Sequence, residues 1–241
     1  MSVSGIARVA ASSKKLVAIH QPNYAPWLGY FYKMARADVF IFLDDAQFSR
    51  GSYTNRVQIA ANGPPRWLTV PVRHAFGASI NRIEVASERW AQAHLDTLHN
   101  SYAKAAHFRA VWPDILDIYA GLPSGSLADA NISLILSLSK RLGIETVTQR
   151  ASDMGCDSMI ADDRLIALCH CSGENVCYLS GKGGSNYQDE QKFKAASIDL
   201  IYANFEHPRY PVGEITFVAG LSVFDAVFHL GWSGAAALLK A

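Results

Sequence analysis

Two short, fully apolar runs on either side of a helical pattern constrain the fold of this chain more than any other feature. The first run, residues 16–19, stops at a loop that contains Pro22, a residue that cannot continue a central strand. Apolar residues then recur at helical spacing from Trp27, and a second apolar run follows at residues 39–43. A strand, a helix and a strand of this kind are typical of a parallel sheet that is covered on both faces.

The remaining patterns add a hairpin, several helices and two more strands. Alternating runs at 55–59 and 67–72, separated by Asn-Gly-Pro-Pro, predict a β-hairpin. Helical patterns cover about residues 88–106, 108–120, 127–143, 160–171 and 222–239, the last interrupted by Gly231, and further strands are predicted at 176–179 and 200–202. We therefore expect an α/β fold with a parallel-sheet, Rossmann-like core and a mostly helical middle and C-terminal section. The expected organisation is a flexible extension (1–15) before a single α/β domain (16–241), with a helical subdomain at about 88–171.

Composition limits the function classes. The 241 residues carry 22 Lys and Arg against 21 Asp and Glu, a net charge of +1 that argues against a non-specific nucleic-acid binder. No apolar run reaches the roughly 18 residues that span a bilayer, and no secretory leader is visible, so we expect a cytoplasmic protein without membrane insertion. Charged residues make up only 18%, which favours a large buried fraction or a homo-oligomeric interface.

The charge is unevenly distributed along the chain. Residues 1–82 hold 10 Lys and Arg against 3 Asp and Glu, whereas residues 83–241 hold 12 against 18. This excess predicts a positive potential around His20, which suits a small phosphorylated ligand.

Four cysteines fall between Cys156 and Cys177, and we expect reduced thiols. Their spacing lacks the paired C-x-x-C knuckles of a structural zinc site, so buried hydrophobic roles are favoured over metal binding.

Polar residues follow the predicted strands, where ligands of open parallel sheets bind. His20 can donate to a phosphate with the amide of Asn23 beside it, or it can satisfy backbone groups in a capped loop. Lys33 can aim at an anion or lie on a solvated helix face, which is the commoner case. Asp44 and Asp45 can hold Mg²⁺, bind a ribose or accept from a substrate amine, or one of them can cap a turn.

A glycine-rich stretch at 180–185 follows the strand predicted at 176–179. It offers backbone N–H groups, Lys182 and two hydroxyls to a phosphate, although the Walker spacing is absent and an ordinary glycine turn is equally consistent. Arg56 can pair a carboxylate or phosphate. Trp90, His94 and Tyr102 share one face of a predicted helix and favour a core stripe over a cofactor site.

The string H-Q-P-x-Y-x-P-W-x-G, which starts at His20, resembles the signature of the WbqC-like protein family. The resemblance runs from about residue 16 to the end and includes Lys33, Asp44, Asp45, Asn55, Arg56, residues 67–72, residues 152–154, residues 178–181, Gly184, Tyr187, His207, Pro208, Leu221, Ser222 and Asp225. Gln188, where an apolar residue is expected, and residues 1–15 depart from the pattern. The family occurs with O-antigen genes, and the resemblance implies a glycine (aminoacyl) transferase that modifies an amino sugar in surface polysaccharide biosynthesis.

The arrangement also resembles the nucleotidyltransferase superfamily, in which H-x-G-H or H-x-G-N and a mobile serine- and lysine-rich loop clamp ATP. His20 to Asn23 correspond to the first motif and residues 180–185 to the second, with Pro22 in place of the glycine. This resemblance implies ATP with Mg²⁺ and an acyl-adenylate that is passed to the amine of an amino sugar or nucleotide sugar. The alternatives are acyl transfer from a preactivated donor, with His20 as general base, and a non-catalytic nucleotide-sugar binding protein.

The resulting site prediction has two parts. The expected catalytic residues are His20, Asn23 and Asp44. The expected substrate- and nucleotide-binding residues are Gln21, Tyr24, Trp27, Lys33, Asp45, Asn55, Arg56, Ser180, Gly181, Lys182, Gly184, Ser185, Tyr187 and His207.

Overall fold

The structure is a computed structural model that describes all residues except 1–13, 62, 74, 214–215 and 241. The chain forms two compact units, each assembled from separate stretches of sequence. Unit 1 comprises the chain up to Gln21, Tyr32–Asp45 and Ile144–Glu206, and unit 2 comprises Pro22–Phe31, Ala46–Gly143 and the chain from His207. The H-Q-P string therefore crosses the unit boundary between Gln21 and Pro22.

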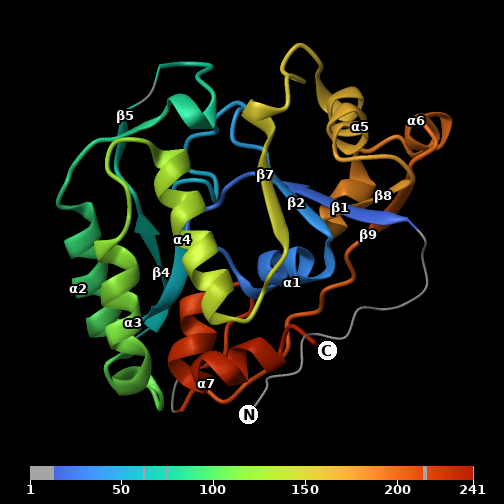
Figure 1. The fold of residues 1–241 in the computed structure, drawn as a ribbon. Coiled ribbons are helices and arrows are strands. Elements are labelled where there is room, and N and C mark those ends of the chain that lie inside the picture. Colours follow the sequence, from blue (N-terminus) through green and yellow to red (C-terminus); the bar gives the residue numbers. More distant parts are fainter. Residues whose placement is uncertain (1–13, 62, 74, 214–215, 241) are drawn as a thin grey trace. The chain divides into compact units, whose positions relative to one another are not determined.

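Unit 1 is built on a five-stranded sheet in which every pair of neighbouring strands is parallel. The order is β7-β2-β1-β8-β9, as Figure 1 shows. The strands are β1 (Lys15–His20), β2 (Val39–Phe42), β7 (Val147–Arg150), β8 (Val176–Ser180) and β9 (Asp199–Tyr202). The predicted α/β class and parallel sheet are confirmed.

Both faces of this sheet are covered, as the unbroken apolar strands predict. Val39 and Ile41 of β2 pack in a core with Leu168 of α5 (Ala161–Cys171) and Phe193 of α6 (Glu190–Ala195). Because side chains alternate along a strand, Phe40 points to the opposite face. There the ammonium of Lys33, from α1 (Leu28–Arg36), lies 6.0 Å from the Phe40 ring centroid.

The strand order creates a topological switch point beside β1. From β1 the chain continues to β2 and then β7 on one side, and it returns to β8 and then β9 on the other. Ligands of open α/β sheets bind outside the carboxyl ends of the strands at such a point. The residues that follow β1 and β8 are therefore the first place to look for a site in unit 1.

Unit 2 combines two antiparallel strand pairs with helices. The predicted hairpin is present as β3 (Arg56–Ala61) and β4 (Gly63–Thr69), and β5 (Val72–Arg73) pairs with β6 (Glu84–Val85). The helices are α2 (Trp90–Tyr102), α3 (Phe108–Ala120), α4 (Leu127–Arg141) and α7 (Val223–Ala237), with a short 3-10 turn, η1 (Ile80–Arg82). Tyr102 and Phe108 stack on Phe228 in the core, and α7 is broken at Gly231, where φ is +70°.

Several details differ from the sequence-based expectations. Strand β7 was not predicted, and the stretch at 180–185 is not an open loop, since it enters a 3-10 turn, η3 (Lys182–Asn186). A second turn, η2 (Ala151–Asp153), follows β7. Within the region 88–171, α2, α3 and α4 belong to unit 2 and α5 belongs to unit 1. Of the expected N-terminal extension, residues 1–13 lie outside the described part of the chain, and β1 begins at Lys15.

Two further expectations concern the cysteines and the membrane. Cys156, Cys169 and Cys177 are buried, as a hydrophobic role predicts, whereas Cys171 is exposed. Within the described residues, none of the helices combines the length and the apolar character that crossing a bilayer requires.

Candidate functional site

The carboxyl ends of β1 and β8 lie side by side in unit 1. Ala18 pairs with Leu179 in the ladder, so the residues that follow each strand, from His20 and from Ser180, leave the sheet at the same edge. Lys33 belongs to the same location, since its Nζ donates a hydrogen bond of 2.8 Å to the carbonyl oxygen of Ile19.

Lys33 is buried, with 3% of its surface exposed, so the solvated-face alternative is wrong. No carboxylate among the described residues forms an ion pair with it. Burial without a compensating negative charge lowers the pKa of Lys33 from 10.5 to about 7. Lys33 is thus a buried basic group whose polar partner is a carbonyl oxygen and not a carboxylate.

His20 lies next to this lysine and is held uncharged at neutral pH. Burial and, to a smaller extent, the positive charge of Lys33 lower the pKa of His20 to about 3. Its Nδ1 is 3.1 Å from the carbonyl oxygen of Gln21. A carbonyl can only accept, so Nδ1 carries the proton and the lone pair is on Nε2. Negative charge at this location would raise the pKa values of both His20 and Lys33.

The stretch after β8 forms a compact turn with two exposed polar side chains. Ser180 is buried, whereas Lys182 and Ser185 are exposed, and the Ser185 hydroxyl donates to the Lys182 carbonyl oxygen over 2.9 Å. Gly184 is held close to the chain around it, because a Cβ at this position would overlap Ser180 Oγ and Gln188 Oε1. Tyr187 follows the turn and is 75% exposed.

The two aspartates after β2 have partners inside the protein. Asp44 is fully buried and accepts hydrogen bonds from the backbone N–H (3.1 Å) and hydroxyl (2.8 Å) of Ser152. Asp45 forms an ion pair with Arg164 of α5. Asp44 thus holds the η2 turn in place. This matches the turn-capping role that the sequence offered as the alternative to a catalytic one. Among the described residues, no third His, Cys, Asp or Glu joins these two aspartates in a group that could hold a metal ion.

Of the other predicted residues of the H-Q-P string, Gln21 belongs to unit 1, and Asn23, Tyr24 and Trp27 belong to unit 2. There a chain of buried hydrogen bonds fixes Tyr24. Nε2 of His94 is 3.0 Å from the Thr69 carbonyl oxygen, so it donates, and Nδ1 accepts from the Tyr24 hydroxyl over 2.7 Å. The Tyr24 oxygen is then left to accept from the Tyr119 hydroxyl. Burial lowers the pKa of His94 to about 4, consistent with a neutral acceptor.

Asn131 of α4 provides a second anchor for this string. Its amide nitrogen donates to the carbonyl oxygens of Pro22 (2.8 Å) and Thr54 (2.7 Å). Asn23 is buried beside this anchored segment in the sequence. The spacing of Trp90 and His94 predicted a buried stripe on one helix face, and this is confirmed. The roles of Tyr119 and Asn131 were not predicted from the sequence.

Asn55, Arg56 and His207 also belong to unit 2. The amide nitrogen of Asn55 donates to the Val70 carbonyl oxygen over 3.2 Å, an interaction that stabilises the hairpin. Arg56 stacks on the ring of Trp67. His207 is partly buried, and burial lowers its pKa.

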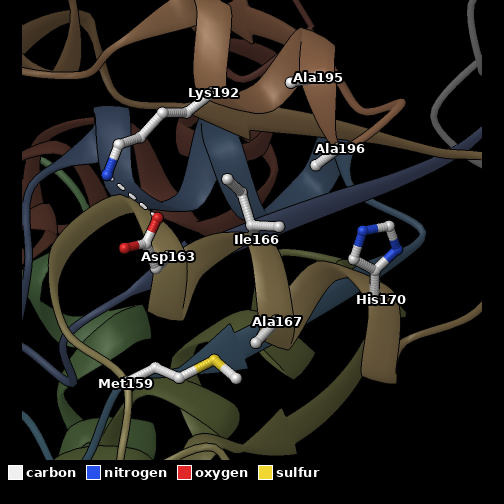
Figure 2. Close-up of a pocket in the computed structure, with 8 residues that line it drawn as sticks. All are labelled: Met159, Asp163, Ile166, Ala167, His170, Lys192, Ala195 and Ala196. Carbon is white, nitrogen blue, oxygen red and sulfur yellow. Dashed lines mark hydrogen bonds and ion pairs between the residues drawn. The ribbon is translucent and has the colours of Figure 1, made fainter.

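A pocket on unit 1, formed by α5 and α6, contains none of the predicted site residues (Figure 2). Its floor is apolar, and Lys192 and Asp163 form an ion pair of 3.1 Å across it. The pocket is lined by Met159, Asp163, Ile166, Ala167, His170, Lys192, Ala195 and Ala196.

The fold and this geometry define an α/β protein with a buried basic group at the switch point of a parallel sheet. The chain belongs to the WbqC-like protein family, whose model matches residues 21–237. It is also 32% identical over 223 residues to the uncharacterized protein Rv1507c of Mycobacterium tuberculosis (strain ATCC 25618 / H37Rv), and the match covers 90% of this chain and 94% of that protein. The expected family resemblance is therefore confirmed.

Proposed function

We propose that the protein is an aminoacyl (glycyl) transferase that modifies an amino sugar of a surface polysaccharide or its nucleotide-activated precursor, with an acyl-adenylate as intermediate. Family membership supports the choice of a WbqC-like activity. The observation that carries the proposal is the pair of neighbouring basic residues, Lys33 and His20, at the carboxyl end of the central strand, where the buried Lys33 has a carbonyl oxygen as its hydrogen-bond partner. Basic residues after β1 and a glycine-rich turn after the neighbouring strand β8 also support a relationship to nucleotidyltransferases.

The basic pair suits a substrate that brings its own negative charge. Burial imposes a desolvation cost on any proton on Lys33, and phosphate oxygens would offset that cost by pairing with the ammonium. The exposed Lys182 and the hydroxyl of Ser185 follow the neighbouring strand and can contact the outer phosphates.

The proposed reaction has two steps. An oxygen of the amino-acid carboxylate attacks the α-phosphorus of ATP, and the bond to the leaving pyrophosphate breaks. The sugar amine then attacks the carbonyl carbon of the acyl-adenylate, loses a proton and expels AMP. Lys33 stabilises the negative charge that builds on the phosphates in the first step. Once bound phosphates have raised its pKa, His20 donates from a protonated Nε2 to the same phosphates in the first step, and after pyrophosphate has left, Nε2 takes the amine proton in the second.

His20 takes the amine proton both in this route and in its main alternative. Acyl transfer from a preactivated donor would use His20 as the general base, and an imidazole with a pKa of about 3 is a weak base at neutral pH. In the proposed route the bound phosphates raise that pKa before the amine reacts. A non-catalytic nucleotide-sugar binding protein remains the third possibility and predicts binding without turnover.

Glycine-dependent exchange of pyrophosphate into ATP tests the proposal. We expect exchange by the wild-type protein, loss of exchange in His20→Ala and Lys33→Met, and wild-type exchange in Lys192→Gln, which alters an exposed ion pair on α6. Circular dichroism verifies that each variant is folded. Full exchange in a folded His20→Ala protein would overturn the assignment. Amide product formed without ATP from a thioester or charged tRNA would select the preactivated donor instead.

A further inference from the structure

Three aromatic side chains in unit 2 form a continuous row. The ring centroids of Trp27 and Tyr53 are 5.2 Å apart, and those of Tyr53 and Trp67 are 6.0 Å apart. We call these three residues the aromatic row. Tyr53 is 43% exposed and Trp67 41%, whereas tyrosines such as Tyr24 and Tyr30 are almost completely buried. Aromatic rings that remain in water next to one another mark a binding surface rather than a core.

A cation accompanies the row. The guanidinium carbon of Arg56 lies 4.1 Å from the ring centroid of Trp67, a cation–π contact. Its Nε is buried and makes no hydrogen bond, and no described carboxylate forms an ion pair with Arg56. Gly51 packs close by, since a Cβ at this position would lie 3.4 Å from the guanidinium. Arg56 is thus held in place without a negatively charged partner in the described part of the chain.

The hairpin brings a further hydrogen-bonding group to the same face. Gln58 pairs with Trp67 in the antiparallel ladder of β3 and β4, and Arg56 is two residues before it. Because side chains alternate along a strand, Arg56, Gln58 and Trp67 share one face of the hairpin. Gln58 is partly exposed, so its amide can bond to hydroxyl groups of a ligand.

The tilt of the rings indicates which ligand fits. Adjacent rings are inclined by 56° and 55°, so the row is not the flat platform on which a planar base stacks. The C–H faces of successive pyranose rings are apolar and need not be coplanar, so they can pack on inclined aromatic rings. A carboxylate or phosphate on such a sugar would meet the fork of Arg56.

We propose that the aromatic row and Arg56 bind an acidic oligosaccharide, with the sugar rings packed on Trp27, Tyr53 and Trp67 and the negative group paired with Arg56. The inference deepens the proposed function and rests on it in one respect: the bound glycan is the sugar substrate, or the chain that carries it. Binding itself requires no turnover and is measured without ATP or glycine.

The test is tryptophan fluorescence quenching with the full-length protein and three probes: trigalacturonate, maltotriose and UMP. A glycan array with hexuronate-containing, phosphorylated and neutral oligosaccharides accompanies it. We expect saturable binding of acidic glycans, with neutral glycans at least about tenfold weaker. Trp67→Ala and Tyr53→Ala should each reduce the affinity for acidic glycans at least about tenfold. Arg56→Gln should reduce the affinity for acidic glycans to that for neutral ones.

Phe76→Ala is the matched control, because this aromatic side chain is completely exposed and lies outside the row. It should bind acidic glycans as the wild-type protein does. The proposal is overturned if no glycan binds, if UMP binds more tightly than every acidic glycan, or if Trp67→Ala and Tyr53→Ala leave binding unchanged. His20→Ala should lose pyrophosphate exchange and keep glycan binding. Glycan binding without any exchange in the wild-type protein would therefore refute the proposed function alone.

Discussion

Lys33 donates a hydrogen bond of 2.8 Å from its Nζ to the carbonyl oxygen of Ile19, at the end of the central strand of a parallel sheet. A helix thereby delivers a cation to the switch point of the sheet, where no described carboxylate pairs with it. The cost of burying that cation makes the free energy of unfolding depend on pH.

Lys33→Met should stabilise the protein at low pH and remove part of its pH dependence. The folded protein binds the Lys33 proton less tightly than the unfolded chain, with a pKa of about 7 against 10.5. The free energy of unfolding therefore rises as the pH increases between these values. In the variant this rise should disappear, with a gain at pH 6 on the order of 3 to 5 kcal/mol before the lost hydrogen bond is counted.

Urea denaturation from pH 6 to 10 checks this prediction, and Lys192→Gln, an exposed lysine, serves as the control. Equal slopes in the wild-type protein and Lys33→Met would contradict the burial of an uncompensated charge. Added pyrophosphate should stabilise the wild-type protein more than Lys33→Met, because the anion pairs with the ammonium.

Asp44 should behave as a structural residue. Asp44→Asn and Ser152→Ala should each lower the free energy of unfolding by about 1 to 3 kcal/mol, since each leaves a buried polar group without its partner. The double variant should show a coupling of about 0.5 to 3 kcal/mol in a thermodynamic cycle. Asp163→Asn, which removes an exposed ion pair, should cost less than about 1 kcal/mol.

Pyrophosphate exchange separates this role from catalysis. Both single variants should retain exchange wherever they remain folded. An Asp44→Asn protein with wild-type stability and no exchange would restore the catalytic role that the sequence predicts.

The fold was largely predictable because its strongest signals are local. The runs that became β1, β2 and β8 are continuously apolar, which in itself implies a covered parallel sheet. Strand β7 escaped prediction because it is an edge strand whose partner is β2 and whose Val147 is 61% exposed. The division into two units was equally hidden, since each unit joins stretches that are distant in the sequence.

The site was less predictable because it depends on packing. Sequence position alone places His20 and the residues after Ser180 behind strands, but only the strand order shows that these strands are neighbours. A lysine on a short helix is usually solvated, and the burial of Lys33 is visible only once the sheet is assembled. Tyr53 lies in a turn before the hairpin and Trp67 within the hairpin, and only the structure shows that both are exposed and that their rings are neighbours.

The hydroxyl of Tyr24 should matter more than that of an exposed tyrosine. Tyr24→Phe leaves His94 Nδ1 and the Tyr119 hydroxyl without their partner in a buried location, at a cost of about 1 to 3 kcal/mol. Tyr202→Phe removes an exposed hydrogen bond to Glu190 and should cost less than about 0.5 kcal/mol. Urea denaturation at pH 7 compares the two, and equal costs would refute the buried hydrogen-bond chain.

Two glycines of the turn after β8, Gly183 and Gly184, should differ in how well they tolerate a methyl group. Gly184→Ala places a methyl group against Ser180 Oγ and Gln188 Oε1, whereas a Cβ at Gly183 meets nothing within 4 Å. Gly184→Ala should therefore lower the free energy of unfolding by about 1 to 3 kcal/mol and displace the turn that carries Lys182 and Ser185. Gly183→Ala should change stability by less than about 0.5 kcal/mol. Because the turn is proposed to bind the phosphates of ATP, Gly184→Ala should raise the KM for ATP in pyrophosphate exchange, whereas Gly183→Ala should not. Equal KM values in the two folded variants would remove the turn from the proposed site.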